Sequence, residues 1–121
     1  IQSQSDSFTV LTGHGGSFHQ ALGLGARGGI LAISLFAAEL TLDIYDSFSA
    51  GDVDASAEAQ RAVAPPAAEI VGRMGVAGVK AAMDRVGLKG GRVRSPLVPL
   101  SIEDEARVDA LLRDARVTAA V

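Results

Sequence analysis

Two short apolar runs near the beginning of the chain have the pattern of buried β-strands. Residues 8–11 (FTVL) and residues 28–34 (GGILAIS) contain no charged side chain and show little alternation of polar and apolar positions. Strands that are buried on both faces, as in parallel sheets, have this composition. Residues 17–24 lie between them with helical spacing, and Ser17 stands in the N-cap position. The pattern therefore predicts a β-α-β unit.

The rest of the chain changes to the spacing of amphipathic helices, in which apolar residues recur every three or four positions. The predicted helices and their apolar stripes are one with Leu40, Ile44 and Phe48, one over residues 52–64, one over residues 76–86 with Val79, Met83 and Val86, and one from Ser101 with Val108, Leu111, Leu112 and Ala115. Gly51 and Gly87 are expected to end the first and the third. The fold class is therefore α/β with a helical second half.

Three segments should interrupt or begin these helices. Pro65-Pro66 is expected to break or kink the second helix, because proline cannot donate a backbone hydrogen bond and disfavours helical backbone in the residue before it. Residues 89–100 contain glycines and spaced prolines, which predict an extended surface loop. Ser101 is placed to cap the last helix, with Asp104 in the acidic position of a capping box.

The two predicted strands cannot complete a sheet by themselves. Parallel sheets are found almost only when both faces are covered, and one helix cannot cover both faces of residues 28–34. The later helices could cover a face but cannot supply missing strands. We therefore expect the chain to be the C-terminal part of a larger α/β protein, or a second chain to complete the sheet.

Composition narrows the function classes. The chain has 121 residues and 48% hydrophobic content, enough for the core of one domain. A net charge of −3, without a basic stripe interleaved with aromatic residues, argues against a nucleic-acid partner. There is no cysteine for a disulfide or thiolate metal site, and no apolar run approaches the roughly 18 residues of a membrane span. The chain begins at Ile1 without a secretory signal, so we expect a cytoplasmic protein with no membrane partner.

The segment Gly13-His14-Gly15-Gly16, here called the elbow, is the main candidate site. Backbone N–H groups between a strand and a helix can bind an anion, and ligands of α/β proteins bind at the carboxyl ends of parallel strands. The elbow lacks the ending of a P-loop and the spacing of GxGxxG, and its glycines would equally serve a turn that needs positive φ. No cysteine or carboxylate lies between His14 and His19, so no metal site is expected.

Other reactive side chains have simpler interpretations. A desolvated Lys80 could form a Schiff base, but on a helix beside an apolar stripe it is expected to extend into solvent. Ser17 has no histidine and aspartate at triad spacing, and capping explains it. No catalytic residue is therefore assigned within this chain.

From about Phe8 to its end, the chain resembles the C-terminal part of the dihydrodipicolinate synthase / N-acetylneuraminate lyase family of class I pyruvate-dependent aldolases. The segments that carry the resemblance are FTVLTGHGGSFHQALGLGARGGILAIS, AAELTLDIYDSFSAGDVDASAEAQR and GVAGVKAAMDRVGLKGGRVRSPLVPLS. The resemblance implies a (β/α)8 TIM barrel in which residues 8–11 and 28–34 are the last two strands. Residues 1–50 would then be the last two βα units, and residues 51–121 a C-terminal helical extension.

The resemblance also implies an activity. Enzymes of this family bind pyruvate or a related 2-oxo acid as a Schiff base, without a cofactor, and catalyse aldol condensation or cleavage. The lysine that forms the Schiff base belongs to the sixth strand, which would lie outside this chain. The chain alone is therefore expected to be inactive, to need the rest of the barrel, and to belong to a homo-oligomer, either a tetramer or a dimer.

Three substrate-binding residues follow from the resemblance. Gly13 matches the family glycine whose backbone faces the bound oxo acid, and Ile30 matches an apolar residue that lines the pyruvate pocket. His14 and Gly15 stand where the synthases commonly carry two aspartates, which is nearer to the 4-hydroxy-2-oxoglutarate aldolase branch. A protonated His14 would then face a distal carboxylate of the substrate.

A non-catalytic interpretation stands beside this one. The chain would be an independently folded helical module that binds a partner through its apolar faces. Such a module should be monomeric in size-exclusion chromatography and should unfold cooperatively, whereas a severed barrel should do neither.

Overall fold

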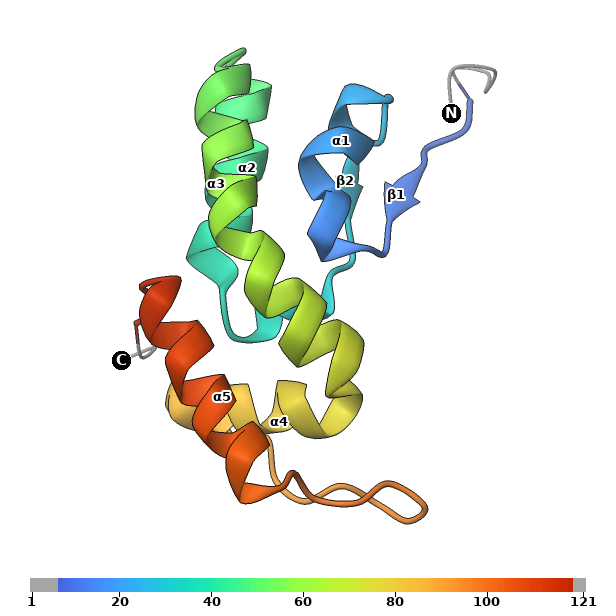
Figure 1. The fold of residues 1–121 in the computed structure, drawn as a ribbon. Coiled ribbons are helices and arrows are strands. Elements are labelled where there is room, and N and C mark those ends of the chain that lie inside the picture. Colours follow the sequence, from blue (N-terminus) through green and yellow to red (C-terminus); the bar gives the residue numbers. More distant parts are fainter. Residues whose placement is uncertain (1–6, 119–121) are drawn as a thin grey trace.

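The structure, a computed structural model, describes residues 7–118 and consists of two parallel strands followed by a series of helices (Figure 1). The elements are β1 (Leu11–Thr12), the 3-10 turn η1 (Gly15–Ser17), α1 (Phe18–Gly23), β2 (Gly28–Gly29), the 3-10 turn η2 (Ala32–Leu35), α2 (Ala38–Ser49), α3 (Val53–Pro66), the π-helical η3 (Ala67–Arg73), α4 (Gly75–Arg85) and α5 (Ile102–Asp114). The α/β class and the β-α-β order are confirmed, and helix predominates.

Both strands are shorter than the sequence predicts. β1 and β2 pair in parallel, with Leu11 opposite Gly28 and Thr12 opposite Gly29. Residues 8–10 precede the strand, and the predicted strand over residues 28–34 leaves the sheet and coils into η2. There the buried side chains of Leu31 and Ile33 pack into the helical core. The apolar side chains after β2 thus pack into the helical core and do not extend the sheet. Periodicity alone cannot distinguish such a segment from a buried strand.

The two-stranded sheet is open to solvent. The exposed fractions are 63% for Phe8, 50% for Leu11 and 79% for Ile30, and the sheet formed by residues 7–118 contains only β1 and β2. Parallel sheets normally have both faces covered. The exposed apolar side chains therefore agree with the expectation that further strands complete this sheet.

The core lies among the helices. Its fully buried members include Ile44 on α2, Val63 on α3, Ile70 on η3 and Val108 on α5. The predicted stripe of α5 is confirmed, since all four of its residues are buried. On α4, by contrast, the buried residues are Gly78, Ala81 and Ala82, whereas Val79 and Met83 are only half-buried; Val86, just beyond the helix, is buried as predicted. Small side chains at the contact therefore carry the packing of α4.

Of the predicted break or kink at Pro65-Pro66, the structure shows no break, but the α-helical form ends at Pro66 and changes there to π-helical turns. Both prolines lie inside α3, and Pro66 has φ −65° and ψ −31°, which are helical values. The fixed φ of proline suits a helix, and its missing N–H affects only the bond to the preceding turn. The helix then continues as η3, whose wider turns are a form of local distortion found inside helices.

Helix α5 is held by its cap and by ion pairs. Ser101 Oγ accepts a hydrogen bond from the Asp104 N–H at 3.1 Å, as predicted. The ion pairs to the preceding helices are Arg107 with Glu69, Arg73 with Asp104, and Arg85 with Glu105 and Asp109. The hydrogen bond from Arg107, with the charges of Arg107 and Arg73, lowers the pKa of Glu69. Because these side chains are half-buried or exposed, solvent screens their attraction.

The Ser101 cap gives a testable contribution to stability. Replacing Ser101 with alanine should lower the free energy of unfolding by about 1 kcal/mol, because an N–H of the first turn loses its acceptor. Denaturant unfolding measures the change. The control is Ser49→Ala at the exposed end of α2, which should change the free energy of unfolding by less than about 0.5 kcal/mol. Equal losses in both variants would contradict the cap.

Within residues 7–118, no helix combines the length and the apolar character needed to cross a membrane.

Candidate functional site

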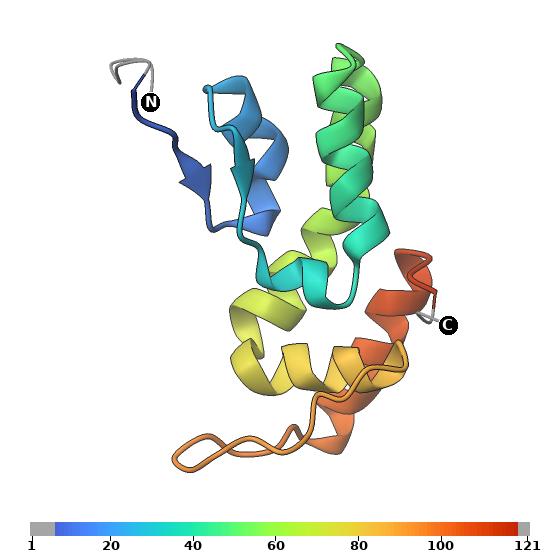
Figure 2. The same cartoon turned by 180° about the vertical axis from the view of Figure 1, so that it is seen from behind.

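The carboxyl ends of β1 and β2 lie side by side. The Ile30 N–H donates to the Thr12 carbonyl at 2.9 Å, so Gly13 and Ile30 are neighbours just beyond the paired residues. Figure 2 shows both strands running toward the same end, where the chain turns into η1 after β1 and toward η2 after β2. The three expected substrate-binding residues, Gly13, His14 and Ile30, are therefore brought to one end of the sheet.

His14 is exposed and held in place by its own segment. Its N–H donates to Thr12 Oγ1 at 3.2 Å, and its Nδ1 lies 2.9 Å from Ser17 Oγ. The prediction that Ser17 caps α1 is wrong, because within the described chain its side chain makes no capping bond. Ser17 instead orients the imidazole ring of His14.

Two glycines of the elbow allow neighbouring side chains to approach the backbone closely. A Cβ on Gly15 would lie 2.6 Å from Ile33 Cγ2, and a Cβ on Gly16 would lie 2.9 Å from Cε1 of the His14 ring. Apart from its two chain neighbours, Gly13 has no residue of the described chain within 4 Å of its Cβ position. None of these three glycines has a positive φ in the described chain, so the turn-geometry interpretation is wrong. Gly15 and Gly16 make room for neighbouring side chains, and Gly13 faces open space.

A buried side chain from α3, which the sequence analysis missed, holds the elbow. Gln60 Oε1 accepts from the His19 N–H at 2.8 Å, and Gln60 Nε2 donates to the Gly15 carbonyl at 3.1 Å. Gln60 thus takes the capping role that was assigned to Ser17. The available signal was the spacing of Ser56, Gln60 and Val63, which puts two polar residues on the buried face of an otherwise apolar stripe.

The remaining candidates are structural. His19 Nδ1 lies 2.8 Å from Ser56 Oγ, and residues 7–118 contain no group of three side chains suited to a metal ion. Lys80 Nζ donates to the Gly90 carbonyl at 2.7 Å, and a Cβ on Gly90 would lie 2.0 Å from the Lys80 carbonyl. Lys80 therefore fixes the base of the loop after α4.

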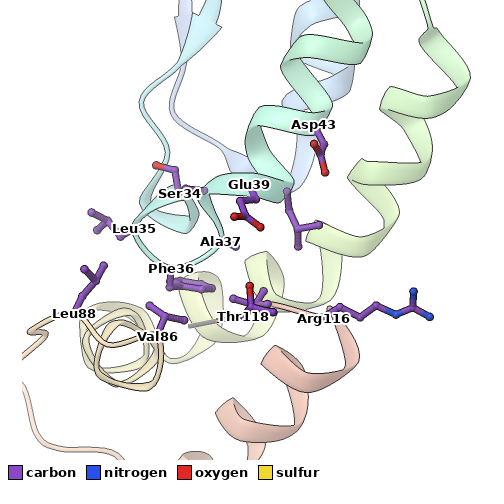
Figure 3. A pocket seen from close by; sticks show the side chains of 13 residues that line it. Ser34, Leu35, Phe36, Ala37, Glu39, Asp43, Val86, Leu88, Arg116 and Thr118 are labelled. Atoms are coloured by element: carbon purple, nitrogen blue, oxygen red, sulfur yellow. The ribbon is translucent and has the colours of Figure 1, made fainter. Parts of the chain in front are cut away.

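A pocket of about 290 Å³ lies between the segment after β2 and the last described residues. Its apolar lining includes Leu35, Phe36, Val86 and Leu88, and Figure 3 shows the carboxylates of Glu39 and Asp43 projecting from α2 beside it. Gly13, His14 and Ile30 are not among its lining residues. The pocket is thus separate from the strand ends.

Comparisons with known proteins agree with this arrangement. Residues 1–115 match the model of the dihydrodipicolinate synthetase family. The chain is 29% identical over 114 residues to 4-hydroxy-tetrahydrodipicolinate synthase of Streptococcus gordonii, an alignment that covers 94% of this chain and 37% of that enzyme.

The chain also superposes on solved structures of proteins from this family. A dihydrodipicolinate synthase of Bacillus anthracis superposes with a TM-score of 0.86 at 25% identity, over 93% of this chain and 39% of that one. A prophage protein of E. coli K12 from the dihydrodipicolinic acid synthase family, crystallised in complex with pyruvate, gives a TM-score of 0.80 at 26% identity, over 91% and 38%. The chain spans little more than a third of the length of the relatives it matches.

Proposed function

The chain belongs to the dihydrodipicolinate synthetase family, and from this premise we propose that it carries part of the substrate site of a Schiff-base-forming lyase or synthase. The substrate class is pyruvate or a related 2-oxo acid. The observation that carries the proposal is the meeting of Gly13, His14 and Ile30 at the carboxyl ends of two parallel strands, where barrel enzymes bind their ligands. The pyruvate complex of the E. coli relative supports the substrate class.

In this proposal β1 and β2 are the last two strands of the barrel. Residues 1–50 form its last two βα units, and residues 51–121 form a C-terminal helical extension. The exposed side chains of Leu11 and Ile30 support this assignment, because a two-stranded parallel sheet leaves uncovered what a barrel would enclose. The lysine that forms the Schiff base then comes from a strand outside this chain.

Each of the three proposed substrate-binding residues has a distinct chemical task. Gly13 exposes its backbone without a side chain, so a small carboxylate can approach the peptide closely. Ile30 offers an apolar contact to the methyl group of pyruvate. A protonated His14 attracts a second, distal carboxylate, which favours a 4-hydroxy-2-oxoglutarate aldolase type of substrate over that of a synthase with aspartates at this point.

Removal of the His14 imidazole tests this substrate preference. In the natural full-length protein, His14→Ala should raise KM for a 2-oxo acid with a distal carboxylate about tenfold, which corresponds to one charge-assisted hydrogen bond. Steady-state kinetics should show KM for pyruvate unchanged. The control His14→Gln keeps a polar side chain and removes the cation, so it should behave like alanine toward the dicarboxylate. An unchanged KM for the dicarboxylate in both variants would rule out this role.

Borohydride trapping tests the proposed activity itself. When the natural full-length protein is reduced in the presence of pyruvate, mass spectrometry should find one pyruvate adduct on a lysine outside residues 1–121. The isolated chain should remain unlabelled. An adduct on Lys80 or Lys89, the two lysines of this chain, or no adduct on the full-length protein, would refute the proposal.

A further inference from the structure

We propose that Gln60 is a positioning residue for the substrate elbow, a role that rests on the function proposed above. Gln60 lies on α3 and is 6% exposed, and both ends of its carboxamide are engaged. The oxygen accepts the His19 N–H at 2.8 Å, and the nitrogen donates to the Gly15 carbonyl at 3.1 Å. One side chain, distant in sequence, thus joins the elbow to α1 and ties both to the helical core.

The two hydrogen bonds require both an acceptor and a donor from the same side chain. The His19 N–H belongs to the first turn of α1, whose donors have no acceptor within the helix. The Gly15 carbonyl needs a donor at nearly the same place. A carboxamide supplies an acceptor and a donor together, and burial makes the loss of either costly.

A second contact fixes the ring of His19. The start of α1, which Gln60 caps, is therefore held in place on two sides. Ser56 Oγ donates its hydrogen to the Ile44 carbonyl at 2.8 Å. A hydroxyl has only one hydrogen, so the 2.8 Å contact between Ser56 Oγ and His19 requires Nδ1–H to be the donor. The His19 ring also meets Phe48 edge-on, with 5.8 Å between the ring centroids. The start of α1 is therefore held against both α2 and α3.

Gln60 acts on the substrate through Gly15. The Gly15 peptide directly follows His14, and Ile33 packs against the same residue from the core. When the Gly15 carbonyl loses its donor, the backbone of Gly13 and His14 can move relative to Ile30. Small displacements of substrate-positioning groups weaken productive binding even when the reacting groups are intact.

Replacing Gln60 with glutamate should remove one of its two hydrogen bonds and keep the other. Gln60→Glu keeps an acceptor for the His19 N–H, and its negative charge suits a helix N-terminus, but it cannot donate to Gly15 when ionised. At neutral pH the full-length variant should have a lower Tm, because the buried Gly15 carbonyl loses its donor, and KM for the 2-oxo acid should rise about tenfold while kcat changes less. At lower pH the protonated carboxyl regains a donor, and KM should return toward the wild-type value. Gln60→Met, which loses both bonds, should show a high KM at every pH and a lower Tm.

The control is Gln20→Glu, the same substitution at an exposed position of α1, which should leave KM unchanged. Amide hydrogen exchange without substrate gives a second readout: residues 13–17 should exchange faster in Gln60→Glu than in wild type. A wild-type KM at all pH values, with wild-type exchange in residues 13–17, would overturn the inference. If the wild-type protein forms no pyruvate adduct, the proposed function fails, and the substrate role of Gln60 fails with it.

Discussion

Replacing Ile33 with alanine is expected to lower the free energy of unfolding by about 2–5 kcal/mol, the range for large-to-small changes in a packed core. The Ile33 side chain is 1% exposed and lies directly beneath the elbow, where its Cγ2 meets Gly15. The substitution removes buried apolar surface and leaves a cavity under the candidate site. Denaturant unfolding of the natural full-length protein measures the change.

Ile30→Ala is the matched control, because it removes the same side chain at a position that is 79% exposed. Its loss of stability should be smaller than that of Ile33→Ala by about 1 kcal/mol or more, because Ile30 faces the proposed substrate site and is not part of the packed helical core. KM for the 2-oxo acid should rise, because Ile30 lines the proposed site. If both variants lose the same stability, the assignment of Ile33 to the core and Ile30 to the site is wrong.

The second large effect is expected at Gly15. Gly15→Ala should lower the free energy of unfolding by about 1–3 kcal/mol, because the new methyl group would lie too close to Ile33 Cγ2 and force the packed side chain or the elbow to move. Gly13→Ala is the control, because its methyl group meets no residue of the described chain within 4 Å apart from its two chain neighbours. The control should change stability by less than about 0.5 kcal/mol.

A double substitution checks that this contact is the cause. In Gly15→Ala combined with Ile33→Ala, the close methyl group is gone and the remaining distance to Ile33 Cβ is 3.6 Å, an ordinary contact. The combined loss should therefore be smaller than the sum of the single losses by about 0.5–3 kcal/mol. Strict additivity would show that Gly15 and Ile33 do not interact.

Local signals predicted the helical half of the chain well. The apolar stripe of α5 and the Ser101 cap depend on residues within one or two turns of each other. The end of α2 near Gly51, which has φ +85°, is fixed equally locally. Periodicity and capping therefore carry enough information for these elements.

The predictions that failed concern positions whose structure is determined by residues far away in the sequence. Residues 28–34 look like a strand, yet Leu31 and Ile33 pack among helices that come later in the chain. The N-terminus of α1 has a serine in the right place, but Gln60, 41 residues beyond His19, provides the bond. The family resemblance indicated Gly13, His14 and Ile30 as substrate-binding residues, but local sequence patterns could not find Gln60, the side chain that holds Gly15 and His19.

The most direct test of the claim that these strand ends form the substrate site is amide hydrogen exchange of the natural full-length protein, before and after pyruvate is trapped by borohydride. Residues 12–17 and 29–31 should exchange more slowly after trapping, and exchange in α5 should not change. Protection that is absent there, or confined to residues 34–43 beside the pocket of Figure 3, would contradict it.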